Sequence, residues 1–224
     1  MPVFLLNDDL VFPDPVQAEP DGLLAIGGDL SPERLILAYQ MGIFPWFSDE
    51  SPILWWSPNP RMVLFPKKFK RSKSLRQTIR NRNFEVRFDT DFSQVIQKCA
   101  ATTRKHEDGT WIIPEMISAY KKLHELGFAH SVETYSDGEL VGGLYGISLG
   151  RAFFGESMFY TERDASKVAL SALVDRMIEW DFLLIDAQQN TEHLGSMGAG
   201  PVSRLEFLLV LEEAMKYPTI KGKW

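Results

Sequence analysis

The first quarter of the chain alternates short apolar runs with glycine and proline, a pattern that favours packed loops and short strands over long regular elements. One helix is predicted in this part. Ser31 is a suitable N-cap, Pro32 suits the first helical position, and apolar residues follow at helical spacing until Gly42. The pattern then changes, so we expect a small N-terminal domain over residues 1–62 and a larger domain over residues 63–224.

In the larger domain, helical and strand signals alternate. Helices are predicted at 74–82, 92–101, 114–126, 165–180 and 204–216. Strands are predicted at 84–88, 129–135, 140–148, 152–159 and 182–188. Asp164 is a candidate N-cap for the fourth helix, and turns at Asp137-Gly138 and Leu149-Gly150 join three of the strands into an antiparallel run. Three antiparallel strands, a crossover helix and a further strand indicate an α+β fold.

Two polar side chains stand out at the end of the last apolar strand. Asp186 and Gln188 are two residues apart, so both should project from one face of the strand. A carboxylate bonded to a carboxamide is suited to orienting and deprotonating an amine, because burial raises the basicity of the acid and the amide fixes its lone pairs. The alternative is an Asp and a Gln that cap a turn at the strand end.

Glu156 lies within the otherwise apolar strand at 152–159, where an unpaired charge would be costly. It should therefore bind a cation or a hydrogen-bond donor. A substrate ammonium and the nearby Arg151 are both candidates. The adjacent Ser157 is not an expected nucleophile, because the Gly-x-Ser-x-Gly pattern is missing and no histidine is close in sequence.

Basic and aromatic residues cluster in the first third of the chain. Three of the six tryptophans fall within residues 46–56, and eight Lys or Arg with no acid fall within residues 67–82, in a chain whose net charge is −6. Stacking surface beside positive charge favours RNA contact, although basic helices are often only a solvated face and tryptophans are more often core. The basic block consists of Lys67, Lys68, Lys70, Arg71, Lys73, Arg76, Arg80 and Arg82.

Several classes of site are not indicated. A single cysteine excludes an intrachain disulfide framework, and the four histidines lack the spacing of a zinc site. No glycine-rich phosphate loop lies between a strand and a helix. No apolar run approaches the ~20 residues of a membrane span, and the N-terminus lacks the pattern of a secretory signal. We therefore expect no metal, no nucleotide cofactor and no membrane, and a cytoplasmic location.

Six motifs occur along the chain in the order in which one family carries them. They lie at 23–32 (LLAIGGDLSP), 42–48 (GIFPWFS), 54–61 (LWWSPNPR), 109–112 (GTWI), 155–159 (GESMF) and 185–188 (IDAQ). Together they closely resemble the bacterial leucyl/phenylalanyl-tRNA–protein transferases, from about residue 10 to beyond Gly198. The resemblance implies a small N-terminal domain followed by a GNAT-like acyltransferase domain, with a mostly antiparallel mixed sheet flanked by helices.

The resemblance also implies an activity. Such an enzyme takes Leu or Phe, with Met as a third candidate, from the 3′ end of a charged tRNA. It places this residue on a protein or peptide whose N-terminal residue is Arg or Lys, which marks the protein for degradation through the N-degron pathway. The reaction is aminolysis of an ester by the acceptor α-amine, whose ordinary pKa is ~8. The family needs no metal or soluble cofactor, and a monomer is expected.

By the same resemblance, Asp186 paired with Gln188 would activate or orient the amine, and Glu156 would hold an ammonium group of either substrate. Trp46 and Trp111 would flank the terminal adenosine, and the basic block would follow the acceptor-stem phosphates. The acceptor's basic side chain would prefer an acidic surface. The donor side chain would enter an apolar pocket lined by Leu144, Phe153, Met158, Leu170, Leu173 and Ile185.

Two pocket positions depart from the family: Leu144 stands where Met is expected, and Leu173 where an aromatic residue is expected. The ranking of Leu, Phe and Met as donors is therefore open. Two rival classes fit less well. An acetyl-CoA-dependent N-acetyltransferase would need a glycine-rich loop at 160–166, which has no glycine and two acids. A non-catalytic RNA-binding module would leave the three candidate catalytic residues without a task.

Overall fold

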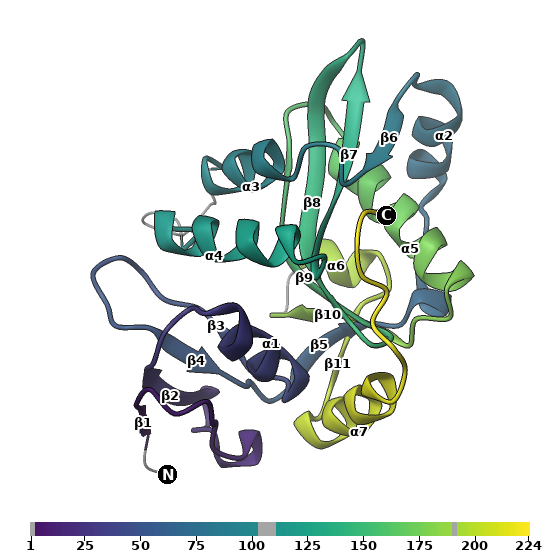
Figure 1. Ribbon diagram of the computed structural model, residues 1–224. Helices are drawn as coiled ribbons and strands as arrows, with labels where there is room; N and C mark the ends of the chain where they lie inside the picture. Colours follow the sequence, from purple (N-terminus) through teal and green to yellow (C-terminus); the bar gives the residue numbers. More distant parts are fainter. Residues whose placement is uncertain (1–2, 103–110, 190–191) are drawn as a thin grey trace.

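The computed structural model describes residues 3–102, 111–189 and 192–224, and two β-sheets organise the fold (Figure 1). The smaller sheet has the strand order β1-β2-β4-β3. β1 is parallel to β2, and the other neighbours in this sheet are antiparallel. Its strands are β1 (Phe4–Leu6), β2 (Leu23–Gly27), β3 (Phe44–Pro45) and β4 (Leu54–Trp56).

The larger sheet has seven strands in the order β11-β5-β10-β9-β8-β7-β6. β9 and β10 run parallel, and the other neighbouring pairs are antiparallel. This sheet and the small N-terminal part confirm the predicted α+β class. Its strands are β5 (Arg61–Leu64), β6 (Glu85–Phe88), β7 (Ala129–Ser136), β8 (Glu139–Leu149), β9 (Ala152–Tyr160), β10 (Leu184–Gln188) and β11 (Gly200–Val202).

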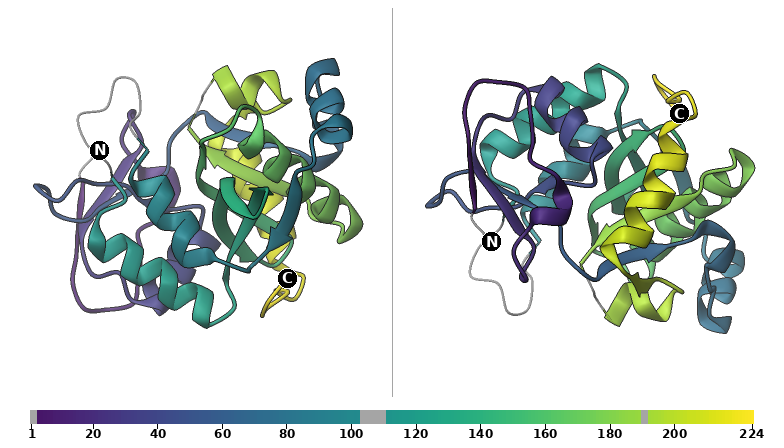
Figure 2. Two further views of the ribbon diagram at one scale, coloured as in Figure 1. Left: turned by 90° about the horizontal axis from the view of Figure 1, so that it is seen from above. Right: turned by 90° about the horizontal axis from the view of Figure 1, so that it is seen from below.

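Helices cover both faces of the larger sheet (Figure 1). α3 and α4 lie on one face, where α1 and α7 also pack, and α5 lies on the opposite face with α2 beside it. The view from below in Figure 2 shows α7 crossing the strands. The helices are α1 (Pro32–Gln40), α2 (Lys73–Asn81), α3 (Phe92–Ala100), α4 (Pro114–Glu125), α5 (Ala165–Glu179), α6 (Glu192–Ser196) and α7 (Arg204–Met215), with two 3-10 helices, η1 (Pro15–Gln17) and η2 (Pro66–Lys68). Among the described residues, none of these helices combines the length and the apolar character that a membrane span requires.

Each face of the larger sheet has its own apolar core. Phe154 of β9 packs with α1, α3, α4 and α7, whereas the preceding Phe153 packs against α5, and both side chains are buried. Successive residues of a strand point to opposite faces, so one strand supplies both cores. Trp55 of β4 belongs to the same cluster as Phe154. The small sheet therefore shares a core with one face of the larger sheet.

The predicted helices and strands are confirmed, with ends that differ by at most a few residues. Ser31 caps α1 by accepting a hydrogen bond from the Arg34 amide. Asp164 occupies the N-cap position of α5, as predicted, but its side chain makes no capping hydrogen bond. Its backbone is left-handed (φ 68°), and its carboxylate accepts hydrogen bonds from Lys167 Nζ and Thr78 Oγ1 instead.

A buried ion pair joins β5 to β10. Arg61 donates two hydrogen bonds to the Asp186 carboxylate, of 2.8 Å from Nε and 2.6 Å from Nη2. Neither side chain is exposed. The guanidinium also lies 4.6 Å from the ring centroids of both Phe44 and Phe207. Because Phe44 belongs to β3 and Phe207 to α7, this pair connects the small sheet, the larger sheet and α7.

We predict that Asp186→Leu lowers the free energy of unfolding by about 3–5 kcal/mol, because the Arg61 cation is left buried and unpaired. The double variant Asp186→Leu/Arg61→Met should recover much of that loss, since it removes both charges. Urea unfolding curves measure both changes. The exposed pair Glu85 and Arg87 is the matched control, and its replacement by Leu and Met should leave the urea midpoint nearly unchanged. A double variant as unstable as Asp186→Leu would contradict this prediction.

Candidate active site

The six residues predicted to form the donor pocket surround one cavity of ≈320 Å³. They come from β8, β9, α5 and β10, which lie next to one another in the sheet and on its α5 face. Trp46 and Trp111 also line this cavity, as do Glu156, Asp186 and Gln188. An apolar cavity thus opens beside the three polar side chains that the sequence singles out. Residues 103–110, which precede Trp111, lie outside the described residues.

A β-bulge in β9 places Glu156 at this cavity. Tyr145 of β8 pairs with Ser157, but the next residue, Gly146, pairs with Gly155, so Glu156 has no partner on β8. The extra residue shifts the alternation of the strand by one position. Phe153 and Met158 can therefore both line the cavity although they are five residues apart. Regular alternation along β9 would put them on opposite faces.

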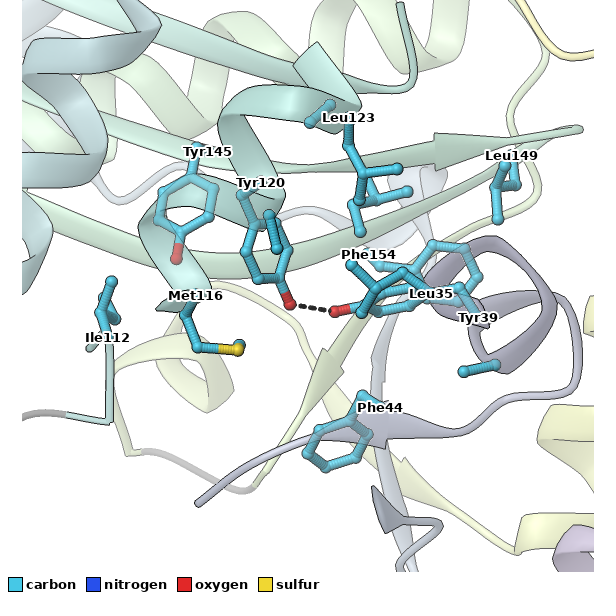
Figure 3. Close-up of a cluster of buried hydrophobic side chains, with 14 of the residues drawn as sticks. Leu35, Tyr39, Phe44, Ile112, Met116, Tyr120, Leu123, Tyr145, Leu149 and Phe154 are labelled. Carbon is cyan, nitrogen blue, oxygen red and sulfur yellow. Dashed lines mark hydrogen bonds between the residues drawn. The ribbon is translucent and has the colours of Figure 1, made fainter. Parts of the chain in front are cut away.

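Three donors hold the Glu156 carboxylate. Tyr39 Oη and Gln188 Nε2 each donate to Oε1 at 2.8 Å, and Tyr120 Oη donates to Oε2 at 3.0 Å. The two phenol oxygens are 2.5 Å apart, and Figure 3 shows the rings pointing toward one another from α1 and α4. Arg151 is not the partner of Glu156, because its guanidinium donates to the Trp180 carbonyl instead.

The environment of Glu156 favours its neutral form. Burial raises the pKa of this carboxyl to about 7, although the hydrogen bonds from Tyr39, Tyr120 and Gln188 act in the opposite direction. Burial and the nearby carboxylate also raise the pKa of both phenols well above their ordinary value. The two phenols and the carboxyl make three contacts with one another, and each contact needs one proton to be a hydrogen bond. When Glu156 is ionised, only the two phenol protons are present. A proton on Glu156 supplies the third, so this group can change charge near neutral pH.

Asp186 and Gln188 are linked differently from the predicted side-chain pair. A second bulge, between Asp186 and Gln188, interrupts the pairing of β10 with β5, and Gln188 has a left-handed backbone (φ 59°). The Gln188 amide nitrogen donates to Asp186 Oδ1 at 2.9 Å, while the Gln188 carboxamide donates to Glu156. The prediction of a hydrogen bond between the Asp186 and Gln188 side chains is therefore wrong. Asp186 fixes the backbone of Gln188, and Gln188 reaches Glu156.

Helix α6 lies between the cavity and the basic block. Leu194 of α6 lines the cavity, and the Met197 carbonyl, just after this helix, accepts a hydrogen bond from the Lys70 amide at 2.8 Å. Two members of the block are engaged within the protein: Arg71 bonds Ser171 and Asp175, and Arg82 bonds Glu162. The exposed members without an ion pair among the described residues are Lys67, Lys68, Lys70, Lys73, Arg76 and Arg80.

Sequence reasoning missed three residues of this site. Tyr39 and Tyr120 lie in predicted helices and Arg61 ends the motif at 54–61, but each reaches its partner across more than thirty positions of sequence. A buried phenol or guanidinium signals that some polar partner is present, without identifying it. Within the described residues, no group of three or more His, Cys, Asp or Glu is arranged to hold a metal ion.

Known proteins resemble this chain over most of its length. The family model described as leucyl/phenylalanyl-tRNA protein transferase matches residues 63–212, and the model of that family's N-terminal domain matches residues 28–59. The leucyl/phenylalanyl-tRNA–protein transferase of Desulfatibacillum aliphaticivorans is 54% identical and covers 100% of this chain and 96% of its own. That of Syntrophobacter fumaroxidans is 58% identical and covers 95% and 91%.

Solved structures are more distant. A GCN5-related N-acetyltransferase from Kribbella flavida has a TM-score of 0.37 and 8% identity, over 77% of this chain and 61% of that one. An aminoglycoside acetyltransferase from an uncultured soil sample has a TM-score of 0.38 and 14% identity, over 58% and 87%. The family models and the full-length relatives confirm the resemblance seen in the motifs: the chain belongs to the leucyl/phenylalanyl-tRNA–protein transferase family and is an aminoacyltransferase.

Proposed function

We propose that the protein moves leucine or phenylalanine, with methionine as a third candidate, from charged tRNA to the α-amine of proteins that begin with Arg or Lys. The observation that carries the proposal is the apolar cavity that ends beside Glu156. The product would be marked for degradation through the N-degron pathway. We further propose that the enzyme acts in the cytoplasm as a monomer, without a metal or a soluble cofactor.

The cavity suits an unbranched or γ-branched apolar side chain. Its walls are Leu, Ile, Phe and Met side chains. Burial of apolar substrate surface against them stabilises the complex by about 25 cal/mol per Å². Met158 is flexible and can adapt to donors of different shape. With the donor side chain inside, its α-carbon and ester carbonyl would lie at the cavity mouth, near Glu156 and between Trp46 and Trp111. Those two rings would then hold the terminal adenosine.

Glu156 is the group best placed to handle an ammonium. In its ionised form it attracts a substrate ammonium, and with a pKa of about 7 it is also matched to accept a proton from an amine of pKa ~8. The neutral amine attacks the ester carbonyl carbon, an amide bond forms, and the carbon–oxygen bond to the ribose breaks. The proton lost by the amine is finally carried by the released ribose hydroxyl.

Asp186 has a positioning role in this scheme. Both of its oxygens bind Arg61, and Oδ1 also accepts the Gln188 amide, so the carboxylate is already satisfied. It orients Gln188, whose carboxamide donates to Glu156 at 2.8 Å. The six exposed cations of the basic block would bind the acceptor-stem phosphates, and the chain's net charge of −6 favours an acceptor with a basic N-terminal residue.

Transfer of radiolabelled leucine from charged tRNA tests the proposal. Label should appear on a peptide with N-terminal Arg and not on the same peptide with N-terminal Ala. Glu156→Gln should lower kcat/KM by about 10²–10⁴-fold, because the ionisable group is lost. Glu139→Gln, an exposed acid on β8, is the matched control and should retain activity. Label on neither peptide, with charged tRNA intact, would refute the proposed reaction.

We predict that kcat/KM rises as the pH passes through about 7, since the ionised form of Glu156 binds the ammonium. Tyr39→Phe or Tyr120→Phe removes a donor to the carboxylate, which raises the Glu156 pKa and moves this midpoint to higher pH. A pH profile of each variant measures the shift. Tyr160→Phe, at a residue that is 63% exposed, should leave the midpoint unchanged. An unmoved midpoint in both active-site variants would exclude Glu156 as the titrating group.

The basic block should control the salt dependence of tRNA binding. Lys67→Ala or Arg80→Ala should each reduce the slope of log K against log salt concentration by about 1, because one phosphate contact is lost. Fluorescence anisotropy with labelled charged tRNA gives this slope. Lys216→Ala removes an exposed cation that lies outside the basic block, just after α7, and should not change it. Equal slopes in all three variants would place the tRNA elsewhere.

A further inference from the structure

The segment after α7 runs back across the α5 face of the larger sheet and ends near β7 (Figure 1). Three hydrogen bonds hold it there. Thr219 Oγ1 accepts from the Gly150 amide at 2.9 Å, the Gly222 amide donates to the Gly127 carbonyl at 3.3 Å, and the Trp224 amide donates to Asp89 Oδ2 at 2.9 Å. The segment is therefore an ordered part of this face.

Trp224 is the residue of this segment that reaches inward. Its ring stacks on His130, with centroids 3.7 Å apart and an interplanar angle of 11°, and meets the Trp180 ring at 90°. His130 is itself buried, and its Nδ1 lies 2.8 Å from Asp89 Oδ2, the same oxygen that accepts the Trp224 amide. One carboxylate oxygen thus fixes both members of the stack.

Phe153 connects this stack to the cavity. It lines the cavity, and its ring centroid is 5.9 Å from that of Trp224. The same ring presses on the backbone of Gly146, where an added Cβ would lie 2.6 Å from two ring carbons. Gly146 of β8 is paired with His130 of β7 in the sheet. Of these two paired residues, Gly146 lies against the Phe153 ring and His130 against the Trp224 ring. Phe153 is held between Gly146 and Trp224.

We propose that Trp224 is a specificity-determining residue of the donor pocket, which sets the pocket's depth by holding Phe153 from behind; this rests on the proposed function. Removal of the indole leaves space on the side of Phe153 that faces away from the cavity. The ring can then withdraw, because the Gly146 backbone blocks movement in only one direction. A deeper pocket favours the longer phenylalanine side chain over leucine.

The test is the ratio of kcat/KM for phenylalanyl-tRNA to that for leucyl-tRNA, measured on the full chain with an N-terminal Arg peptide. Trp224→Ala should raise this ratio by about 10-fold, the lower end of the range that one methylene produces in an apolar pocket. Trp224→Phe keeps an aromatic ring in the stack, so its ratio should be close to that of the unmodified chain. Trp224→Leu serves if the Ala variant does not fold, and should move the ratio in the same direction.

Leu211→Ala is the matched control. Leu211 is a buried residue of α7 in the other apolar core, so its truncation lowers Tm without touching Phe153. It should reduce both kcat/KM values, if at all, by the same factor. The inference is overturned if the Trp224 variants leave the ratio unchanged or if Leu211→Ala shifts it equally. Failure of the proposed function is a different result, since the unmodified chain would then transfer neither amino acid.

Discussion

The ion pair between Arg61 and Asp186 is the interaction on which the candidate site depends. Removing two charges from water costs free energy. The low dielectric of the protein interior also strengthens the attraction between the charges, which offsets that cost when the hydrogen-bond geometry is good. Two hydrogen bonds and two flanking rings meet that condition here. The anchored carboxylate then holds the Gln188 amide, and Gln188 holds Glu156. A structural charge pair in this way orients a carboxyl whose pKa is raised by burial to about 7.

Two β-bulges on neighbouring strands convert an ordinary sheet into a site. A regular strand gives each face alternate residues, so polar groups and pocket walls would be confined to fixed positions. Because of the bulge in β9, both Phe153 and Met158 line the cavity, and Glu156 contacts α1 and α4. The bulge in β10 turns Gln188 toward Glu156. Both irregularities lie where the apolar cavity meets the polar cluster, as is common near active sites.

Much of the fold could be predicted from sequence because helices and strands reflect local periodicity. The six pocket residues were also identified, through resemblance to a family, and the structure brings them together. The bulges could not be predicted, because one extra residue in a strand leaves no local mark. Tyr39 and Arg61 were missed for a related reason. Tyr39 was predicted only as part of a helix and Arg61 only as the end of a motif, and their partners lie 117 and 125 positions away.

Those separations have a consequence for the order in which the protein acquires its chemistry. Contacts between distant positions close large loops and form only after the local elements are in place. Glu156 receives a hydrogen bond from α1, near the start of the chain, and is oriented through β10, near its end. An incompletely folded chain can have its sheet and its basic helix and still lack the tuned carboxyl. Under the proposed function, such a chain would bind charged tRNA without transferring its amino acid.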